Sequence, residues 1–269
     1  MNNNSLVGVV IVTWNNAKDI RECLQSLQDQ DYPNLKVLIV DNASTDETVR
    51  IVKEEFANVE IIERDKNYYL SPSNNIGIKY LIDKYNVEYI MVLNPDTKLS
   101  KNLVIQLKES LDKDSNTIAS GPKVKFYQNQ FDGKINSAGL IFDGFKQAYD
   151  RGFEEADVGQ FDKEEYVFGV TGACIMYKAS YLAEIGFYWE KIKLYMDELE
   201  LFIRSNKAGY KVIYNPKATL YHKWMRSADQ HKIEKINKIK ARAWLWIALR
   251  HYTFKSKLAM IKDYLFNRI

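Results

Sequence analysis

Short runs of hydrophobic residues alternate with segments of helical periodicity over the first hundred positions of the chain. The runs are rich in β-branched residues and nearly uninterrupted, as expected for parallel strands covered on both faces. Between the first two runs, apolar residues at positions 20, 23, 24 and 27 repeat at the spacing of one helix face. This alternation predicts an α/β fold with a mostly parallel central sheet flanked by helices. The predicted strands are Val7–Trp14, Lys36–Val40, Val59–Glu63 and Tyr89–Leu93.

A helix is predicted after the second strand, where residues 44–47 read Ser-Thr-Asp-Glu and have the pattern of a capping box. This pattern makes Ser44 the helix cap. The following residues Val49, Val52 and Phe56 then fall on the buried side of the helix.

The second half of the chain has a weaker pattern. Aromatic residues, Gly and Asp are frequent from about Gly121 to Glu165, and we expect a loop-rich or meandering segment there. A helix is predicted from about Asp197 to Lys207, ending at Gly209, and is followed by a strand at Lys211–Tyr214. A second strand-like run covers Ala218–Tyr221.

The C-terminal residues 231–269 carry a strong excess of positive charge. The chain has 269 residues and a net charge of +3, but this segment alone contains ten Lys and Arg against two Asp and Glu. The rest of the chain is mildly acidic, which disfavours a nucleic-acid binder. Two amphipathic helices are predicted here, with stripes of apolar residues at Ile233, Ile236, Ala243 and Ile247 and at Leu258, Ile261 and Leu265.

Two explanations for this tail stay open. Basic helices with several aromatic residues are typical of segments that lie in a membrane interface, where Lys and Arg meet anionic lipid. Alternatively, the helices pack on the rest of the chain or on a second copy in a homodimer, and their charges are merely solvated.

The two cysteines, Cys23 and Cys174, are far apart in sequence and form neither a disulfide framework nor a Cys-x-x-Cys metal pair. We expect a reducing, cytoplasmic location, either free or at the cytoplasmic face of the membrane. No signal peptide is recognisable at the N-terminus, and no stretch reaches the roughly 18 to 20 apolar residues of a membrane span.

Polar residues follow three of the predicted strands. The carboxyl ends of parallel strands meet at one edge of a sheet, where ligands are expected to bind. Asp41 is suited to accept hydrogen bonds from a nucleobase or ribose, and Asp96 is suited to bind a hard divalent cation together with phosphate oxygens. Taken singly, each cluster is also explained as an ordinary turn or an Asn helix cap. The clusters are Thr13-Trp14-Asn15-Asn16, Asp41-Asn42 and Asn94-Pro95-Asp96.

The predicted helix at Asp197 begins with two adjacent acids, Asp197 and Glu198. Acids are favoured at a helix start by the dipole, but a carboxylate pair beside a crevice is also typical of a general base and its neighbour. Glu200 and Arg204 are spaced as a surface ion pair. His222 follows the last strand-like run, and a lone His is more often a packed residue than a ligand.

Two common phosphate-binding motifs are missing from the chain. No Gly-x-Gly-x-x-Gly follows the first strand and no Walker-type Gly-Lys-Ser/Thr is present, which disfavours a dinucleotide dehydrogenase and a P-loop NTPase. Phosphate charge would then be neutralised in another way, and a metal on Asp96 is the obvious candidate.

In order and spacing, these segments resemble glycosyltransferase family 2, and most closely its branch of bacterial rhamnosyltransferases and related polysaccharide-assembly enzymes. The resemblance covers roughly residues 7–227. The segments that carry it are Val9–Asn15, Val40–Asp46, Leu93–Asp96, Gly172-Ala173, Asp197–Leu201 and Ala218–His222.

The resemblance implies a GT-A fold and an inverting transfer from a nucleotide-diphosphate-sugar, with Mn²⁺ or Mg²⁺ as the divalent cation. It divides the chain into a catalytic domain, 1–228, and a basic helical tail, 229–269. The catalytic domain has a nucleotide-binding half to about residue 120 and an acceptor half from about residue 121. The favoured donors are dTDP-rhamnose or a UDP-sugar, and the acceptor would be a glycan or lipid-linked glycan.

By position, the resemblance also assigns roles to single residues. Glu198 takes the place of the catalytic base beside Asp197, although the usual order of the two acids is reversed. Asp96 and His222 would hold the metal, while Asn94 replaces the first acid of the family motif. The implied donor-binding residues are Thr13, Asn15, Asp41, Asn42, Asn75, Asn94 and Asp96, and the acceptor-side residues are Thr171, Gly172 and Arg204.

Two other functions remain open. A sugar nucleotidyltransferase would share an α/β nucleotide site, but it usually needs a Gly-rich basic loop near the first strand, and residues 13–22 offer only Lys18 and Arg21 and no glycine. A binding or assembly partner that has lost activity is favoured by Asn94 and by the reversed acids.

Overall fold

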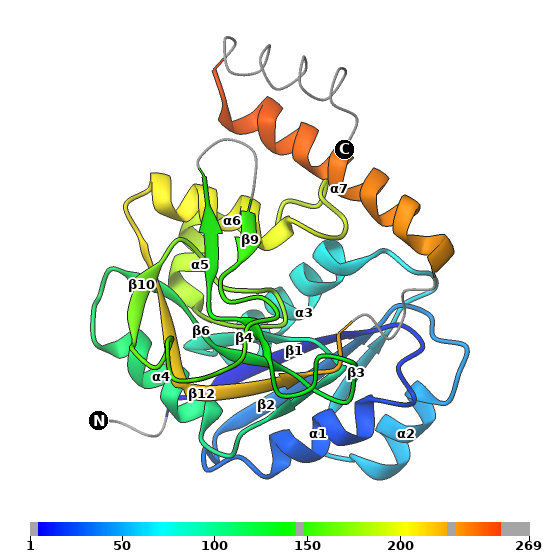
Figure 1. The fold of residues 1–269 in the computed structure, drawn as a ribbon. Helices are drawn as coiled ribbons and strands as arrows, with labels where there is room; N and C mark the ends of the chain where they lie inside the picture. Colours follow the sequence, from blue (N-terminus) through cyan, green and yellow to red (C-terminus); the bar gives the residue numbers. More distant parts are fainter. Residues whose placement is uncertain (1–4, 144–147, 225–229, 254–269) are drawn as a thin grey trace.

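The computed structural model describes residues 5–143, 148–224 and 230–253. A single large sheet runs through the molecule with helices on both faces (Figure 1). Its strand order is β10-β12-β6-β11-β4-β1-β2-β3, with β5 paired to β12 and β7 paired to β6. The α/β prediction, a central sheet flanked by helices, is therefore confirmed.

The four N-terminal strands are confirmed to within one residue at each end. They are β1 (Val7–Thr13), β2 (Leu35–Asp41), β3 (Glu60–Glu63) and β4 (Tyr89–Leu93). All their mutual pairings are parallel, and residue 13 pairs with residue 41. The polar residues that follow these strands thus lie along one edge of the sheet.

Four helices accompany these strands: α1 (Ile20–Gln28), α2 (Thr48–Glu55), α3 (Leu70–Tyr85) and α4 (Leu103–Asp112). All four predicted apolar positions of α1 are buried.

The predicted capping box of α2 is wrong. The helix begins at Thr48, whose backbone N–H donates to the Asp46 carboxylate at 3.0 Å. Ser44 instead donates its hydroxyl to Asp41 at 2.5 Å. The contact with Asp41, three residues earlier in the chain, replaces the capping interaction that the sequence favours.

The region from Gly121 onward is more ordered than predicted, because β6 (Thr117–Phe126) is a long buried strand. Two lysines interrupt its apolar pattern, yet Lys123 is buried against Asp157, with its Nζ 3.0 Å from the carboxylate. A chain of short strands then follows, as the expected meander. They are β7 (Ile135–Ser137), β8 (Leu140–Phe142), β9 (Ala148–Asp150) and β10 (Glu165–Val167).

Three strands complete the sheet: β5 (Thr97–Leu99), β11 (Cys174–Lys178) and β12 (Lys211–His222). β11 is antiparallel to β4 and β6, so the sheet is mixed in its second half. The two strand-like runs predicted after residue 210 form one strand, β12, whose pairing with β6 is irregular between Asn215 and Thr219.

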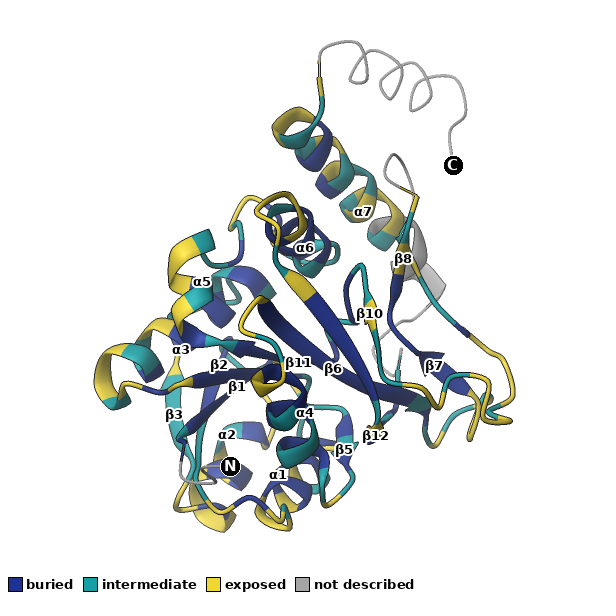
Figure 2. Cartoon of the chain, turned by 90° about the vertical axis from the view of Figure 1, so that its left-hand side faces the viewer, coloured by how far each residue is buried: buried dark blue, intermediate teal, exposed yellow. Residues whose placement is uncertain are grey.

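The hydrophobic core lies on both faces of the sheet, and the central strands are buried while the helices expose their outer faces (Figure 2). Gly77 allows α3 to pack directly on this sheet. A Cβ added at Gly77 would lie 2.6 Å from the Val10 side chain and 3.1 Å from that of Val40.

The second half also contributes α5 (Ala179–Ile185), α6 (Asp197–Lys207) and α7 (Gln230–His251). The bounds of α6 are those predicted, and Gly209 follows it with a φ of +84°. α7 is the first predicted tail helix, and the second lies outside the described residues.

The tail helix α7 packs on α6 at the top of the molecule in Figure 1. Ala243 and Ile247 are buried against Ile192, Leu199 and Ile203. Of the two explanations for the tail, packing on the rest of the chain is therefore seen for α7. Among the described helices, none is long and apolar enough to cross a membrane.

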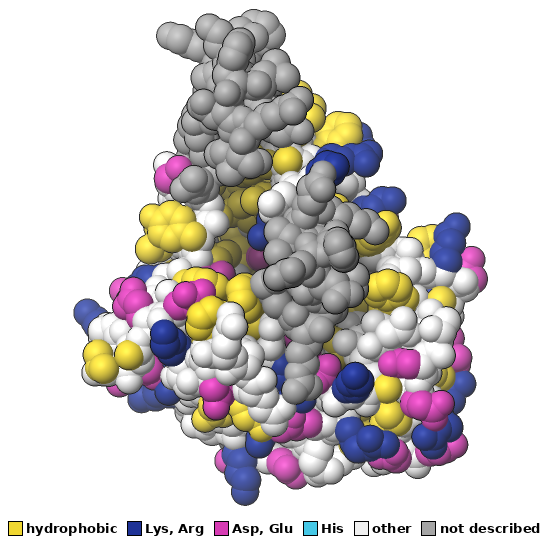
Figure 3. All heavy atoms as spheres, turned by 45° about the vertical axis from the view of Figure 1, so that its right-hand side comes forward, with side chains coloured by type: hydrophobic (Ala, Val, Ile, Leu, Met, Phe, Trp, Pro, Cys, Tyr) yellow, Lys and Arg dark blue, Asp and Glu magenta, His cyan; other side chains and the backbone are white. Residues whose placement is uncertain are grey.

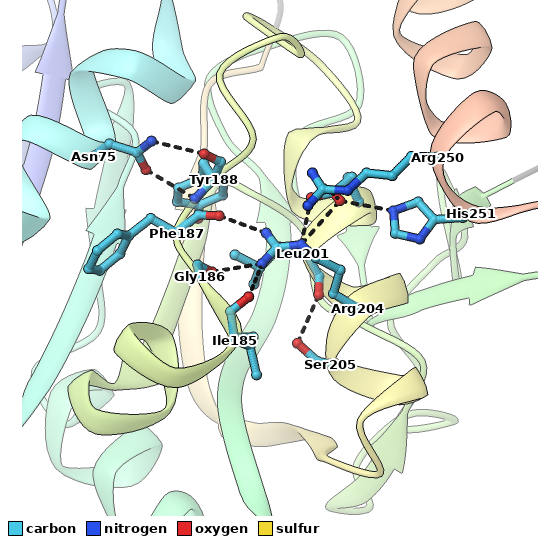
Figure 4. A network of polar contacts seen from close by, with 11 residues as sticks. Asn75, Ile185, Gly186, Phe187, Tyr188, Leu201, Arg204, Ser205, Arg250 and His251 are labelled. Carbon is cyan, nitrogen blue, oxygen red and sulfur yellow. Dashed lines mark hydrogen bonds and ion pairs between the residues drawn. The ribbon is translucent and has the colours of Figure 1, made fainter.

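Glu200 is the polar centre of this contact (Figure 4). Its carboxylate is fully buried and accepts from Arg204 Nε at 3.0 and 3.1 Å. Two residues at the end of α7 reach the same group, with His251 Nε2 at 2.9 Å and Arg250 Nη1 at 3.3 Å. The alternative of a surface pair between Glu200 and Arg204 is thus wrong, because three cationic or polar groups enclose a buried carboxylate.

On the surface, Lys and Arg are interspersed with Asp and Glu over the lower part of the face in Figure 3. The Arg50–Glu47 pair, for example, is more than half exposed on both sides. Such pairs contribute little to stability.

We predict that Gly77→Ala destabilises the protein by about 1 to 3 kcal/mol in chemical denaturation, because the new Cβ overlaps Val10. Helix propensity alone predicts the opposite sign, since Ala stabilises a helix interior relative to Gly by about 1 kcal/mol. Lys79→Ala, at an exposed site two residues further along α3, is the control and is expected to be neutral. A stabilising Gly77→Ala would contradict the close packing of α3 on β1.

We predict that Glu200→Gln costs about 3 to 5 kcal/mol of stability, because Arg204 then loses its buried counter-charge. Glu47→Gln, which breaks the exposed pair with Arg50, is the control and should cost about 1 kcal/mol or less. Urea denaturation measures both.

The pH dependence provides a further check on Glu200. Burial acts to raise its pKa, but His251, Arg204 and Arg250 lower it overall. The stability that it contributes is therefore present above the ordinary Glu range and is lost as the pH falls through the lowered pKa. The difference between the parent and Glu200→Gln should shrink on acidification, and a constant difference would contradict the network.

Candidate functional site

The ends of β1 and β2 are joined by a buried hydrogen-bond network. Thr13 donates its hydroxyl to Asp41 at 2.8 Å, and the Ser44 backbone N–H donates to the other carboxylate oxygen at 2.8 Å. Asn42 donates its backbone N–H to the Thr13 carbonyl at 2.8 Å. Thr13, Asp41 and Asn42 are all at most 2% exposed. The structure thus brings these three predicted residues together.

The loops beyond this network are held in a strained but hydrogen-bonded form. Asn15 has a φ of +57°, and its backbone N–H donates to the Ser44 hydroxyl at 2.8 Å. Its side-chain oxygen accepts from the Thr45 N–H at 2.8 Å. The neighbouring Trp14 is 55% exposed. Asn16 does not cap α1, which the alternative for this cluster had assumed, because its side chain accepts from the Trp14 N–H.

The start of α3 contacts the same network through Asn42. Asn42 donates its side-chain amide to the Tyr69 carbonyl at 3.1 Å and accepts from the Ser73 hydroxyl at 2.7 Å. Asn75 is not part of this group. Its side-chain amide both donates to and accepts from the Tyr188 backbone, at 2.9 and 3.0 Å.

Asp96 and His222 lie side by side. The pairing of β5 with β12 places residue 222 opposite residue 97, and His222 Nε2 lies 3.4 Å from Asp96 Oδ1. The other ring nitrogen, Nδ1, lies 3.1 Å from the side-chain oxygen of Asn136. Burial acts to raise the pKa of Asp96, but His222 and then Lys223 lower it overall, so the carboxylate is held ionised.

These two residues fit a divalent cation. The Nδ1 atom of His222 contacts the Asn136 side-chain oxygen, so Nε2 is the ring nitrogen that faces the Asp96 carboxylate. Two electron-rich atoms that face each other need a cation or a proton between them. In the described part of the chain, no group of three or more His, Cys, Asp or Glu is placed to hold a metal, so oxygens of a phosphate or water would complete the coordination.

Lys223 lies directly beside this pair. It is buried between Asp19 and Glu22, with its Nζ 3.0 and 2.8 Å from their carboxylates. Its backbone N–H donates to the Asp96 carbonyl at 3.0 Å. Sequence reasoning missed this lysine because its acidic partners lie about 200 positions away.

Asp197 and Glu198 begin α6 after two residues in left-handed conformation, Tyr195 and Met196. Burial raises the pKa of Asp197, and burial and the Asp197 charge raise the pKa of Glu198 well above its ordinary value. The two carboxyls therefore hold a proton between them more readily than exposed acids do. A carboxylate with a raised pKa is a stronger base than an exposed acid, which suits it to accept a proton.

Glu198 faces the turn before β11. A Cβ added at Gly172 would lie 3.5 Å from the Glu198 carboxyl carbon, so only a small residue leaves open space in front of the carboxylate. The next residue, Ala173, accepts through its carbonyl from the Asn94 N–H at 2.9 Å. The base candidate and the segment of Asp96 are thus linked through the turn of Thr171 and Gly172.

Arg204 is directed elsewhere. Its guanidinium donates to the carbonyls of Ile185, Gly186 and Phe187, at 2.5 to 2.8 Å, in addition to Glu200 (Figure 4). It ties the loop before the acids to α6, and that loop also contains Tyr188, the partner of Asn75.

Several site residues were not identified from the sequence. Ser44 was interpreted as a cap, and Asn136 and Lys223 gave no local signal. Lys223 directly follows the segment Ala218–His222, and this adjacent position is the one indication that the sequence offers.

The sequence model of "Glycosyl transferase family 2" matches residues 8–186. Among curated proteins, "Low-salt glycan biosynthesis hexosyltransferase Agl10" of Haloferax volcanii is 23% identical over 210 residues, covering 77% of this chain and 63% of that protein. "N-acetylglucosaminyl-diphospho-decaprenol L-rhamnosyltransferase" of Mycobacterium tuberculosis is 22% identical over 268 residues, covering 90% of this chain and 84% of that protein.

Among solved structures, one of "GalNAc-T7 with UDP, GalNAc and Mn2+" matches with a TM-score of 0.69 at 13% identity, covering 92% of this chain. The chain spans 48% of the length of that protein. This likeness confirms the GT-A fold. Because the family model covers well over half of the sequence, the chain belongs to glycosyltransferase family 2.

Proposed function

We propose that this protein is an inverting, metal-dependent glycosyltransferase. It would move a sugar from a nucleotide-diphosphate-sugar, with dTDP-rhamnose or a UDP-sugar favoured, to a hydroxyl of a glycan or lipid-linked glycan in cell-surface polysaccharide assembly. The observation that carries the proposal is the antiparallel pairing of β4 with β11, which joins the Asp96 segment to the turn that faces Glu198. One site thus offers both a cation position and a carboxylate base.

The similar proteins support the kinds of substrate. The mycobacterial relative is named for transfer of L-rhamnose to a lipid-linked N-acetylglucosamine, and the GalNAc-T7 structure contains UDP and Mn²⁺. Membrane contact or a homodimer through residues 231–269 stays a prediction.

The nucleoside would bind at the ends of β1 and β2. Thr13 and Asp41 form a rigid buried base for the loops, and Asn15 and Asn42 lie at their edge. Because these groups are already hydrogen-bonded to one another, the loops need little reordering when the donor binds.

The diphosphate would lie over Asp96, with Asn94 beside it. A divalent cation held by Asp96 and His222 would stabilise the negative charge that develops on the leaving diphosphate. Asn136 contacts Nδ1 and so orients the His222 ring, and Lys223 adds a buried positive charge beside the same carboxylate. The Asn94 side chain adds no charge at the position where the family commonly has an acid.

Glu198 would accept the proton of the attacking hydroxyl. The acceptor attacks the anomeric carbon from the face opposite the diphosphate, which gives inversion. Thr171 and Gly172 would border the acceptor, because Gly172 leaves the space in front of Glu198 open. Asp197 raises the proton affinity of Glu198 through its charge.

We predict that the protein with Mn²⁺ or Mg²⁺ releases nucleotide diphosphate from at least one of a set of dTDP-, UDP- and GDP-sugars, and that EDTA abolishes the release. Asp96→Asn should lower kcat/KM by at least about 100-fold, because the carboxylate that faces His222 is lost. Asp112→Asn, in α4, is the control and should retain activity.

Three results would contradict this proposal. One is a folded Asp96→Asn variant that is as active as the parent. Another is activity that is unaffected by EDTA. The third is pyrophosphate release from a nucleoside triphosphate with a sugar phosphate, which would identify a nucleotidyltransferase.

We predict that transfer falls on acidification through a pKa well above the ordinary Glu range, because Glu198 must be ionised to accept a proton. Glu198→Gln should lower kcat by about 10²- to 10⁴-fold above that pKa and should remove the acid limb of the pH profile. Asp197→Asn removes the charge that raises the pKa of Glu198, so it should shift the acid limb to lower pH. If Asp197→Asn instead lowers kcat to this extent and removes the acid limb, Asp197 is the base.

A further inference from the structure

Asp150, at the end of β9, is a charged residue that the proposed mechanism does not use. The β8–β9 hairpin pairs Leu140 with Asp150, and the Leu140 N–H donates to the Gly169 carbonyl at 2.8 Å. This contact holds the hairpin against the segment that leads to Gly172. Asp150 is thus placed at the acceptor side of the candidate site.

The Asp150 carboxylate lacks the partners that a buried charge needs. Its Oδ1 atom is buried without a hydrogen-bond partner. The Ser137 hydroxyl is the one side chain that contributes a hydrogen bond to the ionised form within the described residues. The adjacent Arg151 is directed away, because it donates to the Ala138 carbonyl at 2.8 Å and to Glu165 at 2.7 Å. A buried carboxylate oxygen in this state costs stability.

The charged groups around Asp150 belong to the candidate site. Its charge is one of the causes that raise the pKa of Glu198. His222 and Lys240 are the two charged side chains that favour its ionised form, although burial outweighs them and raises its pKa to about 6. Asp150 therefore lies within electrostatic range of both the cation position and the base candidate.

We propose that Asp150 binds a sugar hydroxyl, with the unpartnered Oδ1 accepting its hydrogen bond when the site is filled. The inference rests on the proposed function and names a specificity residue for it. A neutral hydroxyl supplies the missing donor without adding charge. The hydroxyl belongs either to the donor sugar, which would bind on the His222 side of the site, or to the acceptor, which would bind on the Glu198 side.

A residue of this kind discriminates strongly between sugars. A site built to bond a hydroxyl rejects an analogue that lacks it, because the buried acceptor is then left unpaired. We expect the same hydroxyl to matter little once the Asp150 carboxylate has been removed. This reciprocal dependence separates a binding role from a structural one.

The experiment compares the parent with Asp150→Ala, Asp150→Asn and the control Glu154→Gln, whose side chain is exposed four residues further on. Two reactions are measured with the donor that the parent uses. Hydrolysis without acceptor reports on the donor, and transfer to octyl β-glucoside and octyl β-N-acetylglucosaminide reports on the acceptor. Asp150→Ala should lower kcat/KM by roughly 10- to 100-fold, Asp150→Asn by less, and the control not at all.

The pattern of loss identifies the source of the hydroxyl. Loss confined to transfer assigns it to the acceptor, and equal loss in hydrolysis assigns it to the donor sugar. Monodeoxy versions of that sugar complete the test. One of them should be a poor substrate for the parent. For Asp150→Ala, the same deoxygenation should lower kcat/KM less than threefold.

Thermal unfolding at pH 8 excludes a structural role. Removing a buried, unpartnered carboxylate should leave the unfolding temperature unchanged or raise it. Three results would each overturn the inference. They are a loss of activity of less than threefold in Asp150→Ala, an equal effect of deoxygenation on kcat/KM in parent and variant, and a lowered unfolding temperature of the variant. If the parent releases nucleotide diphosphate from no donor, the proposed function itself fails, which is a different result.

Discussion

The pairing of β12 with two strands at once determines where the candidate site forms. β12 runs parallel to β6 and antiparallel to β5. Asn215 pairs with Pro122 and Thr219 pairs with Lys123, so β12 contains three additional residues between these two pairs. An odd shift moves side chains to the other face of a sheet. The irregularity therefore sets which face His222 occupies. Through the pairing of residues 222 and 97, it brings His222 to Asp96 and Lys223 to Asp19 and Glu22.

Such long-range pairings also explain which features could be predicted from the sequence. The first four strands and α6 follow from local patterns, since a buried parallel strand or a helix that ends at Gly209 needs only its own residues to be recognised. β6 was missed because Lys123 interrupts its apolar run and finds its counter-charge more than thirty residues away. Ser44 was misassigned for a different reason, because Asp41, three residues earlier, competes with the helix N-terminus for its hydroxyl.

The buried Glu200 changes the interpretation of the basic tail. Aromatic and cationic residues on α7 are typical of a membrane surface, but several are used within the molecule. Lys191 lies 4.6 Å from the Trp246 ring centroid, and Arg250 lies 4.4 Å from that of Trp189. These pairs connect α7 to the segment before α6, and the contact of Arg250 and His251 with Glu200 connects it to α6 itself. Truncation of the tail would therefore remove two of the three described side chains that contact Glu200 and leave Arg204 as its partner.

The pKa values of the acids in the candidate site differ because the cationic side chains lie beside only some of them. Burial acts to raise the pKa of Asp96 and of Glu198 alike. His222 and Lys223 reverse this effect at Asp96, which stays ionised, whereas Glu198 faces the charges of Asp197 and Asp150 and holds its proton more tightly. Titratable groups whose pKa values are pushed apart in one site are suited to opposite roles. In the proposed mechanism, this difference would suit the β4 end of the site to cation binding and the α6 end to proton transfer.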